Sequence, residues 1–572
     1  MRTKYLLWTI AICSLLSACE EIDESSNRIE IFAESMGGSA KVLINGANGT
    51  WVNNDSININ GTAVAVERHD GHAYISYATP AAVNRAFYPA SLKVLSNSGD
   101  NATLELPTVY HYQANASGQL LELPMAARSS NSNPMEFMHL TGAICVMVKN
   151  TAAVPLTLQS VTLESDRYRL SGSCAVNFTT LQSITPETST NALERCVVMA
   201  FDTGYTLAAS GTLYVMLPVL PVGSDNHFTI SVRAYRSGQS TAYRNSQSQT
   251  GGNDHSLARN ELGYAPMSID ASTPDDVLET IGGAYVVSSP LEFSVMAQAL
   301  SNGWISGTSN ITLLSDIDMT DVPISMINRT NFSGVFDGNN HVVRNLTINS
   351  VNIGAYDYSC ALFRQIIYPG KIKNLILDGL MLNHSQNTTG SVKLAGLIAT
   401  CSNSSNELIN CTVSINSVNL IGAKGAIYFG GLICESEDGN AHINISNCHV
   451  STNISFTGKG SVWWGGLIGF TAGSKTNIIN SSWSGTVSLS VDNNVWIGGF
   501  VGRKNSNEFK ATNCTVDGSI NITAGGSYRY LGNLIGLYNT PGTTDITGTT
   551  ANVLFSLGGT MLNDVENYGI NR

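Results

Sequence analysis

Five short segments in the C-terminal half of the chain repeat one apolar, glycine-containing pattern. They are Leu394–Ile398, Gly430–Ile433, Gly465–Ile468, Gly498–Val501 and Gly532–Ile535. Their central positions, 396, 431, 466, 499 and 533, lie 35, 35, 33 and 34 residues apart. Such a period predicts a tandem array in which each unit buries its apolar face by stacking on its neighbours. We therefore expect an extended, repetitive surface there rather than a compact enzyme core.

A second motif, an asparagine followed by a small residue, recurs at the same period but out of phase. It occurs at Asn410-Cys411, Asn447-Cys448, Asn480-Ser481 and Asn513-Cys514. Equivalent positions in a solenoid stack at the strand spacing of about 4.8 Å, so these cysteines are expected to form a ladder of small buried residues. No histidine or carboxylate recurs beside them, and the sequence therefore predicts no metal site and no cofactor.

The N-terminus has the pattern of a secretory signal. Arg2 and Lys4 precede an apolar run from Leu6 to Leu16, which is too short for a comfortable membrane-spanning helix. The following Leu16-Ser17-Ala18-Cys19 resembles the lipobox of bacterial lipoproteins. That resemblance implies a signal peptide at 1–18, cleavage before Cys19, and a diacylglycerol on the Cys19 sulfur that anchors the protein in outer-membrane lipid.

Residues 19–28 are interpreted as the lipidated tether. Glu20-Glu21-Ile22-Asp23-Glu24 is similar to the acidic export tag of Bacteroidetes surface lipoproteins, which implies a surface-exposed location on the outer membrane. A solvated tether without an export role is the alternative interpretation.

The charge balance excludes one class of partner. Without Arg2 and Lys4 the chain keeps 28 basic residues against 42 acidic ones, so its formal net charge moves from −12 to −14. No basic stripe occurs anywhere, and we therefore expect no nucleic-acid partner. The abundance of glycine, serine, threonine and asparagine, with little helical periodicity, favours an all-β extracellular protein. Without Cys13 and Cys19, nine of the 11 cysteines remain, so disulfides cannot pair them all.

The N-terminal half shows short alternating strands broken by turn signals, typical of β-sandwiches. Five local patterns resemble the fimbrillin family of Bacteroidetes pilus proteins: Trp51–Ile57, Phe87–Ser91, Leu123–Ala127, Phe137–Ala143 and Tyr214–Pro221. The resemblance covers about residues 29–270. It implies two tandem transthyretin-like sandwiches, at 29–135 and 136–270, and a partnership with pilin subunits.

Fimbrillins can polymerise by strand addition after an N-terminal strand is cut away, which requires an open sheet edge. Arg28 is the only basic residue between Cys19 and Lys41 at which such a cut could occur. It is therefore a candidate processing site, with an ordinary surface arginine as the alternative.

A linker is expected at 271–284, followed by the best helix signal of the chain. Ser289 can cap the helix, Pro290 suits its first position, and Glu292 completes a capping box. This entry sequence and the Gly-Leu repeats together resemble bacterial GLUG-repeat proteins. The resemblance implies a parallel β-helix-like solenoid with a cap at 285–350, repeats at 351–540 and a C-terminal cap or strand at 541–572.

Parallel β-helices also carry polysaccharide lyases and hydrolases, which need converging carboxylates. Between residues 380 and 540 the acidic residues are Glu407, Glu435, Glu437, Asp438, Asp492, Glu508 and Asp517. None recurs at an equivalent repeat position with a carboxylate partner, so we expect no enzyme.

An aromatic residue lies three positions before most of the central repeat positions. Tyr428, Trp463, Trp496 and Tyr530 occupy this place, whereas Lys393 interrupts the set. The next position holds core-type residues, so strand alternation sends the aromatic column to the opposite face. A flat strip of aromatic rings would bind sugars well. The alternative is a covered ladder that stabilises the stack.

These observations favour a lipid-anchored surface adhesin, pilus-associated or stand-alone, that binds host-matrix or glycan ligands through its repeats. Two alternatives remain: a glycan-capturing lipoprotein of an uptake system, and a polysaccharide lyase or hydrolase.

Overall fold

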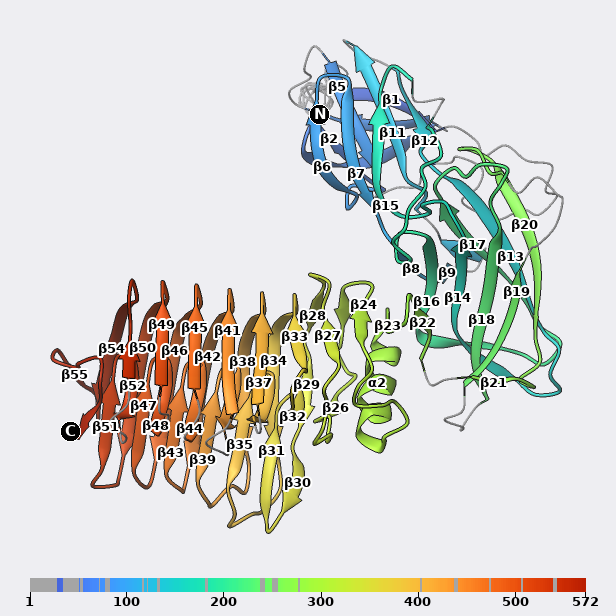
Figure 1. Ribbon diagram of the computed structural model, residues 1–572. Helices are drawn as coiled ribbons and strands as arrows, with labels where there is room; N and C mark the ends of the chain where they lie inside the picture. Colours follow the sequence, from blue (N-terminus) through green and yellow to red (C-terminus); the bar gives the residue numbers. More distant parts are fainter. Residues whose placement is uncertain are drawn as a thin grey trace, which may run out of the picture.

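The computed structural model describes residues 28–33, 51, 55–70, 72–77, 83–115, 118–120, 122–130, 134–180, 184–236, 242–248, 256–275, 278–401, 404–436, 441–472, 475–505, 508–538 and 543–571. These residues form an all-β molecule with sandwich-like sheets in the N-terminal half and a parallel β-solenoid in the C-terminal half (Figure 1). The predicted fold class is confirmed. The signal peptide and Cys19 lie outside the described residues.

Seven strands of the first unit close on one another in the order β1-β12-β11-β5-β2-β3-β4. Their alternating apolar residues, among them Ile57, Ile75 and Phe137, fill the interior beside Trp51. The strands are β1 (Arg28–Ala33), β2 (Ser56–Ile59), β3 (Thr62–His69), β4 (His72–Ser76), β5 (Val83–Tyr88), β11 (Met125–Ser130) and β12 (Met135–His139).

The second unit is a sandwich of a six-stranded and a three-stranded sheet, which share one apolar core. The six-stranded sheet has the order β21-β19-β18-β14-β16-β8: β21 (Pro274–Asp275), β19 (Ala242–Ser248), β18 (Phe228–Arg236), β14 (Leu156–Ser165), β16 (Cys196–Leu207) and β8 (Val109–His111). The three-stranded sheet has the order β17-β13-β20: β17 (Thr212–Val219), β13 (Gly142–Asn150) and β20 (Leu262–Ile269).

The two N-terminal units exchange strands. The sheet β15-β7-β6 joins β15 (Gly172–Asn177) to β7 (Asn101–Leu106) and β6 (Lys93–Ser98), although β15 follows β14 in sequence. In the opposite direction, β8 of the first sequence segment pairs with β16 of the second. A short hairpin, β9 (Gln113–Asn115) with β10 (Gly118–Leu120), completes this half. The sequence patterns did not predict this exchange.

From Lys371 to Tyr538, each turn of the solenoid contributes one strand to each of four sheets, which we call J, K, M and L in the order in which the chain visits them. Sheet J contains β22 (Thr280–Ile281), β23 (Ala284–Val287), β24 (Ile311–Leu313), β27 (Val335–Asp337), β33 (Lys371–Lys373), β37 (Ser404–Ile409), β41 (Ala441–Ser446), β45 (Lys475–Ile479), β49 (Glu508–Thr512) and β53 (Thr543–Asp545). Sheet K contains β25 (Ile317–Asp318), β26 (Ile324–Ser325), β28 (Val342–Arg344), β29 (Thr347–Asn349), β34 (Ile376–His384), β38 (Thr412–Leu420), β42 (His449–Gly458), β46 (Ser482–Val491), β50 (Thr515–Ala524), β54 (Thr550–Leu557) and β55 (Thr560–Leu562).

The remaining two sheets are shorter. Sheet M contains β30 (Val351–Gly354), β31 (Asp357–Cys360), β35 (Val392–Ala395), β39 (Ile427–Gly430), β43 (Val462–Gly465), β47 (Val495–Gly498), β51 (Arg529–Gly532) and β56 (Ile570–Asn571). Sheet L contains β32 (Phe363–Ile366), β36 (Ile398–Cys401), β40 (Ile433–Ser436), β44 (Ile468–Ala472), β48 (Val501–Asn505) and β52 (Ile535–Tyr538).

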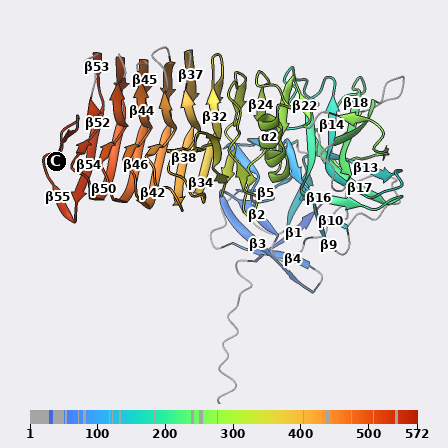
Figure 2. The same cartoon turned by 90° about the horizontal axis from the view of Figure 1, so that it is seen from below.

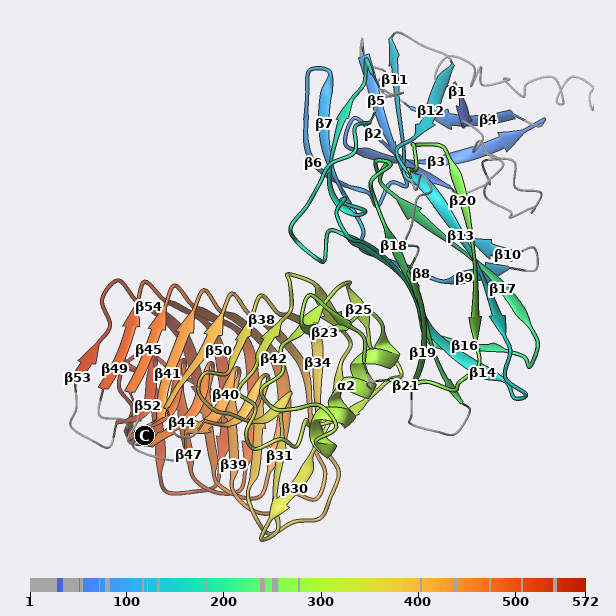
Figure 3. The ribbon, with the colours of Figure 1, turned by 45° about the vertical axis from the view of Figure 1, so that its right-hand side comes forward.

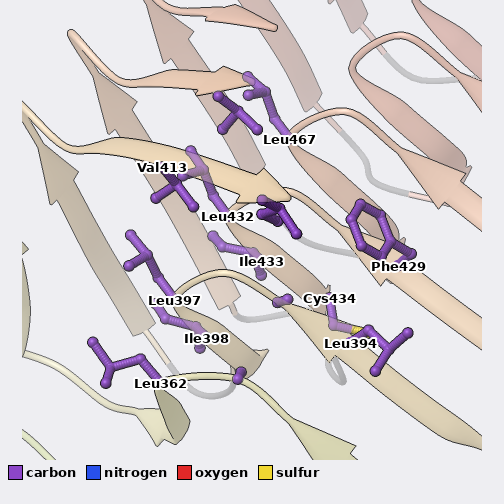
Figure 4. Packing of buried hydrophobic residues seen from close by; sticks show 14 of the residues in the cluster. Leu362, Leu394, Leu397, Ile398, Val413, Phe429, Leu432, Ile433, Cys434 and Leu467 are labelled. Atoms are coloured by element: carbon purple, nitrogen blue, oxygen red, sulfur yellow. The ribbon is translucent and has the colours of Figure 1, made fainter. Parts of the chain in front are cut away.

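The repeated leucine of the Gly-Leu motif lies in the centre of the solenoid. Leu397, Leu432 and Leu467 follow one another along the stack and are fully buried beside Val413 of sheet K (Figure 4). Each turn therefore buries its apolar residues against the turns before and after it, as the period predicts.

The repeated glycines lie where sheets M and L approach each other most closely. A Cβ added to Gly465 of β43 would lie 2.7 Å from the backbone nitrogen of Gly502 in β48, and it would also clash with the Ile468 carbonyl oxygen. Gly498 stands in the same relation to Gly536 on the next turn. A side chain at Gly465 or Gly498 would therefore force sheets M and L apart at these turns, whereas an earlier turn accommodates Ala395 at the equivalent position.

The asparagine-cysteine motif forms the corner between sheets J and K. Asn410, Asn447, Asn480 and Asn513 all have positive φ, between 49° and 53°. The Asn447 amide nitrogen donates to the Asn410 oxygen at 3.1 Å, and Asn480 donates to Asn447 at 3.2 Å. Asparagine tolerates this left-handed conformation, and its side chains form a hydrogen-bonded ladder. The cysteines that follow are buried and free, so the predicted ladder of small buried residues is confirmed.

Helix α2 (Pro290–Asn302) closes the N-terminal end of the solenoid, as predicted (Figure 1). The Ser289 hydroxyl accepts a hydrogen bond from the Glu292 backbone nitrogen at 3.2 Å, and Gly303 ends the helix in the left-handed conformation. The Glu292 side chain does not complete a capping box with Ser289. Instead it accepts from the nitrogen and the hydroxyl of Ser288 at 2.7 and 2.6 Å.

The second sandwich joins the solenoid through a buried contact at the α2 end (Figures 2 and 3). The Gln159 amide of β14 donates to Glu292 Oε1 at 3.1 Å, and the Thr162 hydroxyl donates to Glu279 Oε2 at 2.6 Å. Both carboxylates are only 2% exposed. Residues 271–284, which were predicted as a linker, contribute β21, β22 and the buried Glu279 to this junction.

Candidate binding surfaces of the solenoid

The predicted aromatic column exists and is in register. Tyr428, Trp463, Trp496 and Tyr530 occupy equivalent positions of sheet M, one turn apart, with Lys393 before them. The rings of Tyr428 and Trp463 stack with centroids 4.5 Å apart, and those of Trp463 and Trp496 with centroids 4.4 Å apart, both at 6° between planes. We call these three stacked rings the aromatic ladder.

The stacking geometry limits what the ladder can bind. Tyr428 covers one face of the Trp463 ring and Trp496 covers the other. Sugars pack on ring faces, because the faces offer flat apolar area. The expected flat strip of open ring faces is therefore not present at Trp463, whose partly exposed ring presents edges instead.

Sheet L covers part of the same surface. Lys393 of the column forms an ion pair with Glu435 of β40, and both side chains are largely buried. Burial raises the pKa of the neighbouring Tyr428 hydroxyl. The indole nitrogens of Trp463 and Trp496 are buried and have no hydrogen-bond partner among the described residues. These contacts favour the stabilising role that the sequence left as the alternative, and binding by Tyr428, Trp463, Trp496 and Tyr530 stays a prediction.

The outer face of sheet K has a different character, which the sequence analysis did not identify. Its outward positions alternate with buried apolar ones on each strand and carry mainly hydroxyl and amide groups. They are His449, Ser451, Asn453, Ser455 and Thr457 of β42, Ser482, Ser484, Thr486, Ser488 and Ser490 of β46, Thr515, Asp517, Ser519, Asn521 and Thr523 of β50, and Thr550, Asn552 and Leu554 of β54. We call this set the hydroxyl face. Strands β38, β42, β46, β50 and β54 contain no lysine, arginine or glutamate.

A groove continues the hydroxyl face toward the N-terminal end of sheet K. Its volume is about 590 Å³, and it is lined by Thr320, Asp321, Pro323, Asn345, Thr347, Asn349, Met381 and Asn383. The Asn383 amide nitrogen donates to Asn349 Oδ1 at 2.6 Å, and Asn419 donates to Asn383 Oδ1 at 2.7 Å. We call it the asparagine groove. Met381 is 37% exposed and adds apolar surface to it.

Sheet J presents the opposite case, because its outward charges pair between turns. Lys371 of β33 pairs with Glu407 of β37 at 2.5 Å, and Lys475 of β45 pairs with Glu508 of β49 at 3.5 Å. Lys510 adds a contact of 2.9 Å to Glu508 and lowers the pKa of that carboxyl.

The carboxylates considered for catalysis do not converge. Glu407 and Glu508 lie on sheet J, Glu435 on sheet L and Asp517 on sheet K, and each of the three glutamates pairs with a lysine. Glu437 and Asp438 lie outside the described residues. Within the part of the chain that the structure describes, no group of three or more His, Cys, Asp or Glu residues could hold a metal ion.

The processing candidate Arg28 is the first residue of β1. That strand pairs with β4 on one side and with β12 on the other, so the described barrel has no open edge beside it. In the second sandwich, β17 and β20 are the edge strands of the three-stranded sheet, and β21 and β8 are the edge strands of the six-stranded sheet. No helix in the described ranges combines the length and apolarity needed to span a bilayer.

Comparisons with known proteins show only distant similarity. No family model matches the chain, and no curated protein matches it. A proposed immunoglobulin A1 protease from Bacteroides ovatus is 18% identical, with a TM-score of 0.37, over 50% of this chain and 81% of its own. A proposed cell adhesion protein from the same species is 13% identical, with a TM-score of 0.27, over 43% of this chain and 94% of its own. Another from Bacteroides uniformis is 12% identical, with a TM-score of 0.25, over 44% of this chain and 94% of its own. These values are too low to assign a function.

Proposed function

We propose that this chain is a cell-surface adhesin, anchored through a lipid on Cys19, in which the sandwich units carry a solenoid that binds an external ligand. One observation carries the proposal: sheet K presents a long face of hydrogen-bonding side chains, whereas the described carboxylates considered for catalysis are spread over sheets J, K and L, and the three glutamates among them are paired with lysine. Such a surface suits binding better than hydrolysis, which needs two free carboxylates at one bond.

The buried junction supports the same role. Gln159 and Thr162 of the second sandwich contact Glu292 and Glu279 at the solenoid cap, and one apolar cluster includes Val198 of the sandwich and Val286 of the cap. A buried contact of this kind restricts relative motion, so the sandwiches can hold the solenoid at a fixed angle away from the membrane.

The adhesion test uses beads coated with residues 20–572 and an array of glycans and matrix proteins. We expect retention of the beads on at least one surface, without release of reducing ends or unsaturated sugars. Product release would identify an enzyme, and no retention on any surface would contradict adhesion. Attachment at Cys19 is tested separately: wild type should incorporate a palmitate analogue, whereas Cys19→Ala should stay unlabelled.

Pilin subunits are a further proposed partner, by strand addition at an open edge such as β17 or β20. Proteolysis near Arg28 should then convert monomers into ladders that survive mild denaturant, and Arg28→Ala should prevent this. Clean cleavage that leaves monomers would support a stand-alone adhesin. A gene neighbourhood of transport genes would instead favour a glycan-capturing lipoprotein.

A further inference from the structure

We propose that the asparagine groove and the adjoining hydroxyl face of sheet K form the binding site, and that the ligand is an uncharged polysaccharide. The inference rests on the proposed adhesin function, and it specifies the location and the ligand class, which that proposal leaves open. Three independent features of sheet K lead to it: charge, hydrogen-bonding groups and spacing.

The charge of the surface argues for a neutral ligand. From Thr412 onward the sheet K strands carry no lysine or arginine, so sulfated or phosphorylated chains find no permanent counter-charge there. Asp517 and, in the groove, Asp321 would repel anions further. On the hydroxyl face a basic peptide would find a single carboxylate, Asp517, among hydroxyl and amide groups, which is too little for a charge-matched interface.

The hydrogen-bonding groups fit neighbouring sugar hydroxyls. An amide carries two donors and an acceptor with two lone pairs, so it can bind two adjacent hydroxyls at once. Each hydrogen bond along Asn349, Asn383 and Asn419 uses one donor of one amide and one lone pair of the next. These three asparagines therefore keep hydrogen-bonding capacity for a ligand on each of their three turns. Pro323 and the exposed Met381 supply apolar surface for the C–H groups of a sugar ring.

The spacing fits a chain molecule. Successive turns lie about 4.8 Å apart along sheet K, which is close to the length that one pyranose residue adds to an extended polysaccharide. A chain that runs along the solenoid axis would meet an equivalent set of side chains at each residue. The groove volume of about 590 Å³ lies within the usual range of ligand sites and would hold the end of such a chain.

Affinity electrophoresis of residues 20–572 tests the inference. The probes are four uncharged polysaccharides (mannan, xylan, mixed-linkage β-glucan and starch), two anionic ones (heparin and polygalacturonate), and fibronectin and collagen as immobilised proteins. We expect retardation by at least one uncharged polysaccharide, unchanged between 50 and 500 mM NaCl. Asn383→Ala and Met381→Ala should each weaken it about tenfold.

The matched control is Asn444→Ala, which removes the same side chain from the outer face of sheet J. It should bind as wild type does. The Met381 side chain takes no part in the hydrogen bonds between Asn349, Asn383 and Asn419. Met381→Ala therefore keeps the test valid even if Asn383→Ala disturbs folding, and circular dichroism would reveal such a disturbance.

The other outcomes separate the two proposals. If an uncharged polysaccharide binds but neither sheet K variant weakens it, the site lies elsewhere and only this inference fails. If only heparin, polygalacturonate or a protein binds, the ligand class is wrong while adhesion stands. If no probe binds, the inference and the adhesin function both fail.

Discussion

The aromatic ladder of sheet M and the hydroxyl face of sheet K repeat with the same period, yet their side chains use that period differently. On sheet M, the two faces of the Trp463 ring stack on Tyr428 and Trp496, and Lys393 pairs with Glu435 of sheet L. On sheet K, short hydroxyl and amide groups stand outward from an apolar layer that includes Val487 and Leu489. Periodic repetition alone therefore does not identify a binding face. A repeated side chain that contacts its own equivalents on neighbouring turns has little free surface with which to bind a ligand.

The glycine contact behind the ladder should give the largest effect. Gly465→Val would force a side chain into the backbone of Gly502, and sheets M and L would have to separate. We expect a loss of more than about 4 kcal/mol in the free energy of unfolding of the solenoid. Thermal melts followed by circular dichroism would show it. Ala395, which already carries a Cβ at the equivalent position of an earlier turn, provides the control: Ala395→Gly should cost only about 1 kcal/mol.

Loss of a ring from the aromatic ladder should have the second-largest effect on the unfolding free energy. Trp463→Ala removes two ring stacks and leaves a gap between Tyr428 and Trp496, so we expect a loss of about 3 kcal/mol. Trp463→Phe should recover part of this loss. Polysaccharide binding of the folded variant should remain near the wild-type level. Lost binding with an unchanged melting temperature would show instead that the ring edges form a ligand platform.

The junction offers a third case, in which stability depends on pH. Burial raises the pKa of Glu292 to about 7 in the folded protein, from 4.5 for a free glutamate. The folded state therefore binds this proton more tightly than the unfolded state does. The contribution of Glu292 protonation to the unfolding free energy is fully present below about pH 4.5 and is lost as the pH rises through about 7. The unfolding free energy should fall by up to about 3 kcal/mol across that window.

Glu292→Gln should flatten this fall, because the amide keeps the hydrogen-bonding capacity of the neutral acid without its titration. Denaturant unfolding at pH 4.5, 6 and 8 measures the slope for both proteins. Equal slopes would show that Glu292 is ionised throughout and that its contacts with Gln159 and Ser288 hold a carboxylate.

Much of this architecture could be predicted from sequence because the relevant information is local. The period of 33 to 35 residues predicted that successive repeats stack on one another. Ser289 and Pro290 marked the start of α2. Strand alternation also predicted that Trp463 and Trp464 point to opposite faces, and Trp464 is fully buried.

The remaining features depend on distant partners. The pairing of β15 with β7 and of β8 with β16 joins strands whose alternation is ordinary, so nothing in their residues specifies the exchange. The cover that sheet L gives the aromatic ladder depends on the tight turn at Gly465 and Gly466, whose angle the sequence does not show. The sequence does not distinguish the hydroxyl face, because alternating Ser, Thr and Val is typical of any half-exposed strand.

Substitutions on the hydroxyl face should have the smallest effect on stability. Ser455 and Ser488 are equivalent outward positions of β42 and β46, and their neighbours Ile454 and Val487 lie in the core. Ser455→Ala with Ser488→Ala removes two hydroxyls and no apolar contact, so the unfolding free energy should change by less than about 0.5 kcal/mol. The same double variant should weaken retardation by an uncharged polysaccharide several-fold, because both hydroxyls lie on the axis that the chain would follow. A fall in melting temperature comparable to that of Trp463→Ala, with binding unchanged, would reverse the roles assigned to sheets K and M.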